Sequence, residues 1–300
     1  MKIIESSKIK EKAYIEKLDN GLTVIIIPKE NKQKKYVIWG THFGSIDNHF
    51  IEPVTFTEVY VPDGVAHFLE HKMFEQKNGR NSLDVLMALG VDANAYTTNN
   101  HTAYLFETTN NFYEALDELM DYVQNPYFTD ENVEKEKGII GQEIGMYDDD
   151  PGWQLYMNAL DCMYKENPIK IDIAGTVESI SKIDPDVLYK CYNTFYHPSN
   201  MTLFIYGDVD VVKTFNLIRE NQMLKNFPKE EKIEIKKYEE DEKVDKKLMT
   251  INRNVSIPRT MLCYKTKIPF INGKERFKKS LFASMLLDVK FGAASSFEKE

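Results

Sequence analysis

Two histidines and one glutamate fall within five residues of each other in the stretch HFLEH, residues 67–71. On an α-helix, residues i and i+4 lie on one face with their Cβ atoms about 5–6 Å apart, so His67 and His71 can point at one metal ion. Glu70 lies on the same side, where its carboxylate can hold the water that such an ion activates. The order H-x-x-E-H is the inverted form of the H-E-x-x-H metal-binding helix. A helix with two unrelated histidines is the alternative, so the motif alone does not establish a metal site.

A catalytic zinc ion takes three protein ligands and keeps a fourth position for water. The segment VEKEKGIIGQEIGMYDDD, residues 133–150, places Glu136 and Glu143 seven residues apart and therefore nearly on one helix face. Ile139 and Ile140 lie between them and are expected to anchor this helix to a core. Such a pair suits one ligand and one residue that orients a ligand histidine. A solvated acidic helix face is the alternative, but the histidine pair favours the metal site.

The pattern of residues along the chain indicates both strands and helices. β-Branched runs bounded by polar turns indicate strands, and proline or glycine after a periodic run indicates the end of a helix. The expected strands lie in residues 21–30, 34–44, 92–109 (a hairpin) and 200–210, and the expected helices include 112–124 and 130–147.

Composition limits the classes of function. The formal net charge of −9 argues against a sequence-independent nucleic-acid binder or an anionic-membrane binder. The first residues lack the apolar segment of a signal peptide, and no apolar run is long enough to span a membrane. The three cysteines (Cys162, Cys191 and Cys263) show no CxxC spacing, which fits a reducing compartment. We therefore expect a cytoplasmic protein.

Three hundred residues suggest two domains. Residues 1–228 are predicted to form the first domain. Residues 229–247, which include the charge-dense KEEKIEIKKYEEDEKVDKK, are predicted to be a connector, with one short edge strand in KIEIKKY. Residues 248–300 show a new β-then-α pattern and are predicted to begin a second, similar domain that is incomplete.

Four segments together carry a resemblance to a known family: HFLEHKMFE, VEKEKGIIGQEI, IDIAGTVESI and FYHPSNM. They resemble the inverzincin zinc peptidases, the family of pitrilysin, insulin-degrading enzyme and mitochondrial processing peptidase, and most closely its YmfH-like bacterial branch. The similarity runs from about residue 21 to the end of the chain. It implies an α+β fold of LuxS/MPP-like metallohydrolase domains, each with a mostly antiparallel sheet and helices packed on it.

The resemblance also implies a role for each motif residue. His67, His71 and Glu143 would bind Zn²⁺, Glu70 would be the general base, and Glu136 would support the site from behind a ligand.

The substrate of such a peptidase would be an extended peptide, for example a peptide precursor or a signalling peptide. Residues 92–98 resemble the family's edge strand, to which a substrate adds as a further strand. Asn94 and Ala95 would then lie beside the scissile bond. The family further implies a homodimer, or a heterodimer with a related inactive subunit. We also expect this chain to bind zinc through its first domain but to cleave peptides poorly, because the second domain is predicted to be incomplete.

Two other classes of function remain open at the level of sequence. One is a scaffold subunit of a peptidase heterodimer that retains zinc but does not catalyse. The other is a LuxS-like lyase, whose third zinc ligand is a cysteine and whose chain is about half as long.

Overall fold

The computed structural model describes residues 1–229, 232–265, 273–293 and 295. Its main feature is a seven-stranded sheet in the order β1-β2-β3-β9-β4-β8-β7. A second sheet has the order β10-β5-β6. The strands are β1 (Lys2–Ser6), β2 (Glu11–Lys17), β3 (Thr23–Pro28), β4 (Lys35–Thr41), β5 (His49–Ile51), β6 (Glu58–Tyr60), β7 (Asp92–Thr97), β8 (Thr102–Thr108), β9 (Met201–Gly207) and β10 (Glu234–Ile235).

The large sheet is mixed and mostly antiparallel, as the sequence predicts. Strand β9 pairs parallel to β3 and antiparallel to β4, so a strand from late in the chain separates two strands that follow each other in sequence. Trp39 shows how the sheet meets the core, because its partners across the sheet are Leu203 and Tyr104 and all three are fully buried. Each such side chain contributes about 1.5–3 kcal/mol of stabilisation. This buried face positions everything that packs on it.

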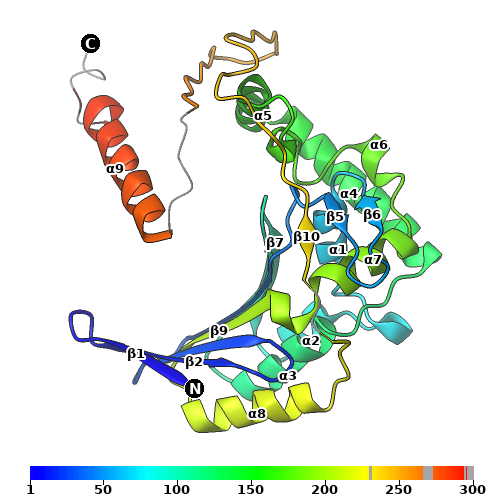
Figure 1. The fold of residues 1–300 in the computed structure, drawn as a ribbon, viewed down its shortest axis with the longest axis vertical. Coiled ribbons are helices and arrows are strands. Elements are labelled where there is room, and N and C mark those ends of the chain that lie inside the picture. The colour runs from blue at the N-terminus through cyan, green and yellow to red at the C-terminus, as the bar shows by residue number, and fades with distance from the viewer. Residues whose placement is uncertain (230–231, 266–272, 294, 296–300) are drawn as a thin grey trace.

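Helices cover that buried face, with α3 and α8 along the sheet and the pair α1 and α4 near β7 (Figure 1). Polar side chains cap the N-termini of several helices. Asn81, Thr129 and Asp184 each accept a hydrogen bond from a main-chain N–H in the first turn of α2, α4 and α7, respectively. The α-helices are α1 (Val65–Lys72), α2 (Ser82–Ala88), α3 (Phe112–Tyr122), α4 (Asp130–Asp149), α5 (Pro151–Met163), α6 (Val177–Ile180), α7 (Pro185–Phe195), α8 (Val211–Met223) and α9 (Gly273–Phe291). The 3₁₀ turns are η1 (Lys77–Gly79), η2 (Pro168–Lys170) and η3 (Pro198–Asn200).

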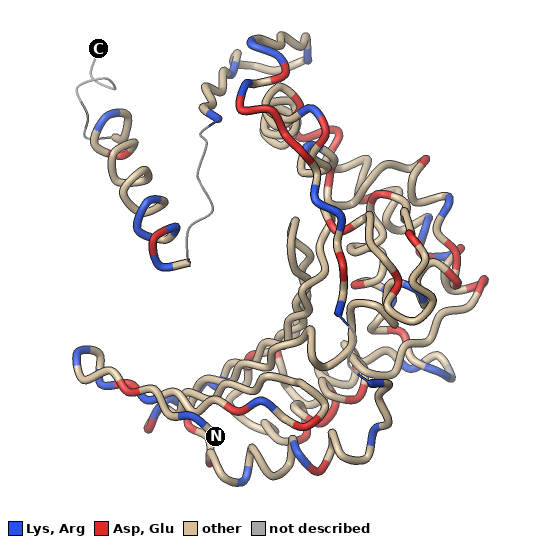
Figure 2. Tube along the Cα trace, viewed as in Figure 1, with Lys and Arg blue, Asp and Glu red and all other residues tan. Residues whose placement is uncertain are grey.

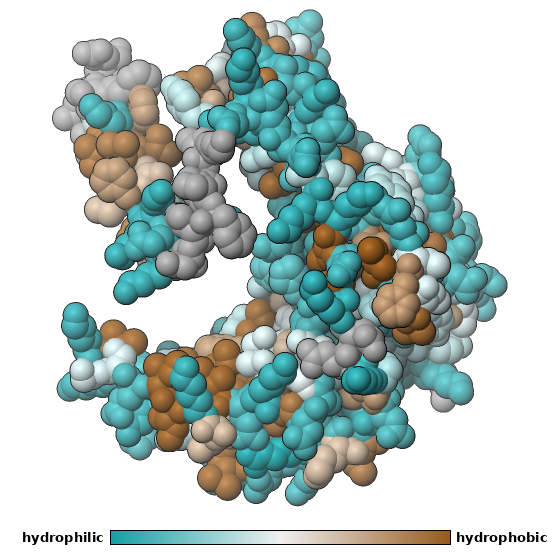
Figure 3. Space-filling model, viewed as in Figure 1, coloured by the Kyte–Doolittle hydropathy of each residue, from teal (hydrophilic) through white to brown (hydrophobic). Residues whose placement is uncertain are grey.

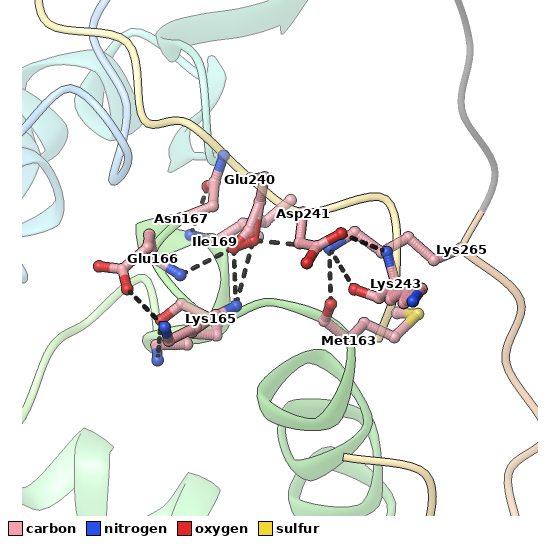
Figure 4. A network of polar contacts seen from close by, with 10 residues as sticks. Met163, Lys165, Glu166, Asn167, Ile169, Glu240, Asp241, Lys243 and Lys265 are labelled. Carbon is pink, nitrogen blue, oxygen red and sulfur yellow. Dashed lines mark hydrogen bonds and ion pairs between the residues drawn. The ribbon is translucent and has the colours of Figure 1, made fainter. Parts of the chain in front are cut away.

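The charge-dense segment after residue 231 is bound to the earlier part of the chain. Strand β10 pairs with β5, as the short edge strand predicted there. Further along, the carboxylate of Glu240 accepts hydrogen bonds from the main-chain N–H groups of Lys165 and Glu166, and Lys265 donates to the carbonyl of Met163 (Figure 4). Lysines and acids stand side by side along this segment (Figure 2). The segment therefore follows the surface of α5 and the turn behind it.

Residues 248–265 contain no strand, although the sequence pattern predicted β structure from residue 248 onward. A strand needs a neighbour to accept its hydrogen bonds, and none of the described residues pairs with this segment. The predicted helix does form, as α9, and it lies apart from the rest of the chain (Figure 1). Its apolar side chains are exposed, among them Phe277 and Leu281. Figure 3 shows this apolar surface on α9. Residues 266–272, where the predicted β pattern ends, lie outside the described residues.

Among the described residues, none of the helices combines the length and the apolar composition that crossing a bilayer requires.

The loop between β4 and β5 supports the β7–β8 hairpin. The N–H groups of Ser45 and Ile46 donate to the carbonyls of Thr98 and Asn99 in the hairpin turn, each at 3.1 Å. Gly44 lies so close that a Cβ there would overlap the main chain of Asn99 and its neighbour. The position of β7 thus depends on close contact between this loop and the turn.

We predict that Gly44→Ala destabilises the fold by about 1–3 kcal/mol, because the new methyl group must displace main-chain atoms. Urea unfolding followed by circular dichroism measures the change. Gly138→Ala is the matched control: it lies exposed on α4 with open space around it and should gain about 0.5–1 kcal/mol. Wild-type stability in Gly44→Ala would show that the turn is not held this tightly.

Candidate metal centre

Helix α1 presents its histidines to α4 because its other side is anchored in the core. Phe68 and Leu69 are fully buried. The helix starts directly after Gly64, whose φ of 91° and close approach to the carbonyl of Ala174 leave no room for a side chain. The eight residues of α1 are therefore fixed at their start and along their length.

The three predicted ligands converge. The rings of His67 and His71 lie 4.6 Å apart, and their Nε2 atoms lie 3.7 and 3.6 Å from the two carboxylate oxygens of Glu143. One ligand atom from each of the three residues fits within 4.8 Å of the others. Tetrahedral bonds to Zn²⁺ of about 2.1 Å place ligand atoms about 3.4 Å apart. The donor set and its spacing therefore fit a zinc ion.

Helix α4 supplies Glu143 and Glu136 from one face, as the seven-residue spacing predicts. Ile140 is fully buried and anchors this helix, whereas Ile139, expected beside it in the core, is 47% exposed. Ile139 and Ile140 lie about 50° to opposite sides of the face that carries the two glutamates. The core packs on the side of Ile140, where Val133 and Ile144 are also buried, so the expectation for Ile139 was wrong.

Glu136 fixes the ring of His71. Its Oε1 lies 3.1 Å from Nδ1 of His71, which leaves Nε2 facing Glu143. Burial alone would lower the pKa of His71, but the hydrogen bond to Glu136 and the nearby carboxylates outweigh it and raise the pKa. Burial would likewise raise the pKa of Glu136, yet His71 and Lys72 together hold it below its usual range. An ionised carboxylate behind a metal-facing imidazole is the usual support of a zinc ligand.

His67 differs from His71 because its buried Nδ1 has no partner in the described part of the chain. Burial, with the nearby His71, lowers the pKa of His67 to about 3. The ring is therefore neutral at ordinary pH, the form that binds a metal ion.

Glu70 is buried beside this group and is held by a residue that the sequence analysis missed. Its Oε2 accepts a hydrogen bond of 2.7 Å from Oγ1 of Thr97, the last residue of β7. Burial raises the pKa of Glu70, and the Thr97 bond opposes the rise. Strand alternation could have identified Thr97, since it shares a face with Ala93 and Ala95.

Strand β7 lies at one end of the large sheet, with β8 as its only described neighbour. Asn94 is exposed on this strand, and its side chain accepts a hydrogen bond from the N–H of Ala95, which is half-buried against the core. The predicted substrate-contacting residues therefore lie on an edge strand that ends beside Glu70.

The fold and this His-His-Glu group resemble those of the zinc peptidases with an inverted helix motif, and comparisons with known proteins show the family. Residues 58–177 match the model of insulinase, peptidase family M16, and residues 182–297 match the M16 inactive domain. The chain belongs to the M16 family.

Particular relatives are also similar. The zinc protease YmfH of Bacillus subtilis is 48% identical over 99% of this chain and 69% of its own length. A crystal structure of an M16-like peptidase from Alicyclobacillus acidocaldarius has 36% identity and a TM-score of 0.85, covering 99% of this chain and 68% of the other. A Helicobacter pylori protease, 22% identical with a TM-score of 0.68 over 77% of this chain and 55% of its own, shares the fold. The chain thus spans about two thirds of the length of the first two proteins, and only 36% of the Mycobacterium leprae zinc protease ML0855, which is 32% identical over 53% of this chain.

We predict that the metal-free protein loses stability on acidification because of His67. Its folded-state pKa is about 3 and its ordinary value is 6.5. Below pH 6.5 the imidazole of His67 takes up a proton in the unfolded chain but stays neutral in the folded protein until the pH falls to about 3. The contribution of His67 to the free energy of unfolding is therefore fully present above pH 6.5 and is lost as the pH falls toward 3. Between pH 6.5 and pH 5 the contribution of His67 alone is a loss of about 2 kcal/mol, whereas the raised pKa values of His71 and Glu70 act in the opposite direction.

Urea unfolding with a chelator present, at both pH values, measures this loss. Asparagine does not titrate in this range, so His67→Asn should lose about 2 kcal/mol less than the wild type over the same interval. Equal losses in the two proteins would contradict the assignment.

Proposed function

We propose that this protein is a zinc-dependent endopeptidase that hydrolyses extended peptides. The convergence of His67, His71 and Glu143, with Glu70 buried beside them, is the observation that carries the proposal. In this proposal the first three residues bind Zn²⁺, Glu70 is the general base, and Glu136 holds His71. Membership of the M16 family, and relatives named as zinc proteases, support it.

The peptide would pair with the edge of β7 that faces no described strand. Main-chain groups along an edge strand bind an extended peptide largely independently of its side chains. In this arrangement Asn94 and Ala95 lie beside the scissile bond. Unfolded segments, such as peptide precursors or signalling peptides, suit this mode of binding better than folded proteins.

Each residue then has a defined task. A zinc ion held here would polarise the scissile carbonyl and acidify its bound water. Glu70 accepts the proton of the attacking water and passes it to the leaving amine. Burial raises the pKa of Glu70, which makes its carboxylate a stronger base for this proton. Thr97 holds one oxygen of Glu70, which directs the other toward the reacting water.

Two observations favour this function over its alternatives. A non-catalytic scaffold has no need of a buried carboxylate beside the ligands, yet Glu70 is kept there at 6% exposure. A LuxS-like lyase takes a cysteine as its third ligand, whereas the group found here contains Glu143 and no cysteine.

We also propose that residues 1–228 form one domain and that residues 229–247 connect it to a second domain that starts near residue 248. We propose further that the working enzyme is a homodimer, or a heterodimer with a related inactive subunit. Strand β9 supports the boundary near residue 228. It lies within residues 182–297, which match the M16 inactive domain, yet it pairs between β3 and β4 and so belongs to the first sheet. The cytoplasm remains our expected location.

The first test concerns the base. Glu70→Gln should bind zinc like the wild type but lower kcat by about 10²–10⁴-fold, because the amide cannot accept the proton. Turnover of a quenched peptide and zinc content by mass spectrometry measure both effects. Glu134→Gln, an exposed glutamate on α4, is the control and should change neither. Normal cleavage by Glu70→Gln would remove Glu70 from the mechanism.

The second test concerns the ligands. His67→Ala, His71→Ala and Glu143→Ala should each abolish stoichiometric zinc binding, whereas Glu136→Ala should weaken the affinity only by about 10–100-fold. Competition with a chromophoric chelator gives the dissociation constants. Full zinc in purified Glu143→Ala would exclude Glu143 as a ligand.

A further inference from the structure

Lys72 is an unusual residue directly behind the metal centre. It is the last residue of α1 and is fully buried, although lysine is almost never fully buried unless it is paired. A buried ammonium group costs several kcal/mol of desolvation, and burying its partner does not reliably return that cost. Fold stability is therefore a poor explanation for a lysine at this position.

The contacts of Lys72 lead to the metal site. Its Nζ is paired with Glu75, three residues further along, and lies 3.4 Å from Oε2 of Glu136. The other oxygen of Glu136, Oε1, is the one that lies 3.1 Å from Nδ1 of His71. The carboxylate of Glu136 is thus held between an ammonium group on one oxygen and an imidazole on the other.

Glu75 is the exposed end of this chain of contacts. Its side chain is 31% exposed, so the Lys72–Glu75 pair reaches the surface while the Lys72–Glu136 pair does not. With three N–H donors, the ammonium group of Lys72 can serve both carboxylates at once. The chain Glu75–Lys72–Glu136–His71 therefore connects the surface to the nitrogen opposite the metal-facing one.

We propose that Lys72 is a positioning residue of the metal centre: its ammonium group holds Glu136 so that Glu136 fixes the ring of His71 with Nε2 toward Glu143. The inference rests on the proposed zinc site. Without Lys72, Oε2 of Glu136 loses the cation that it contacts, and the carboxylate is free to turn away from His71.

The test measures zinc affinity by chelator competition, and does not depend on peptide cleavage. Lys72→Met keeps the length of the side chain and removes its charge, and we expect zinc to bind about 10–100-fold more weakly. Lys137→Met is the matched control: it lies next to Glu136 in sequence but pairs with Glu134 and the carbonyl of Ser181, and it should leave the affinity unchanged.

A double-mutant cycle with Glu136→Gln separates positioning from a general effect of charge. If Lys72 acts through Glu136, Lys72→Met should have no further effect on zinc affinity in the Glu136→Gln background. An unchanged affinity in Lys72→Met, or an equal loss in both backgrounds, would overturn the proposal.

Two further measurements separate a failure of the proposed role of Lys72 from a failure of the zinc site and from a failure of the variant to fold. Wild-type protein that binds no zinc, or His71→Ala that binds zinc normally, would contradict the zinc site itself and not the role of Lys72. If Lys72→Met alone does not fold, the double variant removes the carboxylate charge together with the ammonium charge. Its zinc affinity must then equal that of Glu136→Gln, and a difference between them overturns the proposal.

Discussion

The anchoring of α1 in the core is the constraint on which the site depends. This helix has only eight residues, so its orientation comes from packing and not from its own stability. Phe68 and Leu69 are fully buried on one side, which leaves His67 and His71 on the side toward α4. Because α4 is anchored in turn by Ile140, the distance between the two helices determines how far the histidine nitrogens lie from Glu143. The geometry of the candidate metal centre is thus a product of helix packing.

The second constraint is the charge that this packing encloses. Glu70, Lys72 and Glu136 are all buried, and an isolated buried charge would cost several kcal/mol. The structure reduces that cost by giving each group a specific partner: a hydroxyl for Glu70, two carboxylates for Lys72, and both a cation and an imidazole for Glu136. His67 avoids the cost by remaining neutral. With these partners, several ionisable groups can be buried close together without unfolding the protein.

The sequence predicted the histidine pair, the acidic pair and the strands, because each rests on a local period: four residues for the histidines, seven for the acids, two for the strands. The mostly antiparallel α+β fold and the meeting of His67, His71 and Glu143 were implied by the resemblance to a known family. The sequence could not predict that β9 would separate β3 from β4, since pairing between distant strands leaves no local pattern. Lys72 was missed for the same reason, because Glu136 lies on another helix. Thr97 could have been found from the alternation along β7, but its hydrogen bond to Glu70 could not. The β structure expected from residue 248 did not form in the described residues, which shows that β propensity without a neighbouring strand is insufficient.

Strand β7 has a consequence for the peptides that the proposed enzyme can accept. The strand that would receive the peptide also carries Thr97, which holds Glu70. A peptide that pairs with β7 must therefore keep its N–H and C=O groups in hydrogen-bonding register with the strand as far as Thr97, which lies next to Glu70, the proposed general base. Proline has no N–H and its ring fixes the φ angle, so a proline that faces the strand breaks the pairing where alignment matters most. Resistance to cutting around proline would then follow from the main chain of the peptide, whatever its other side chains.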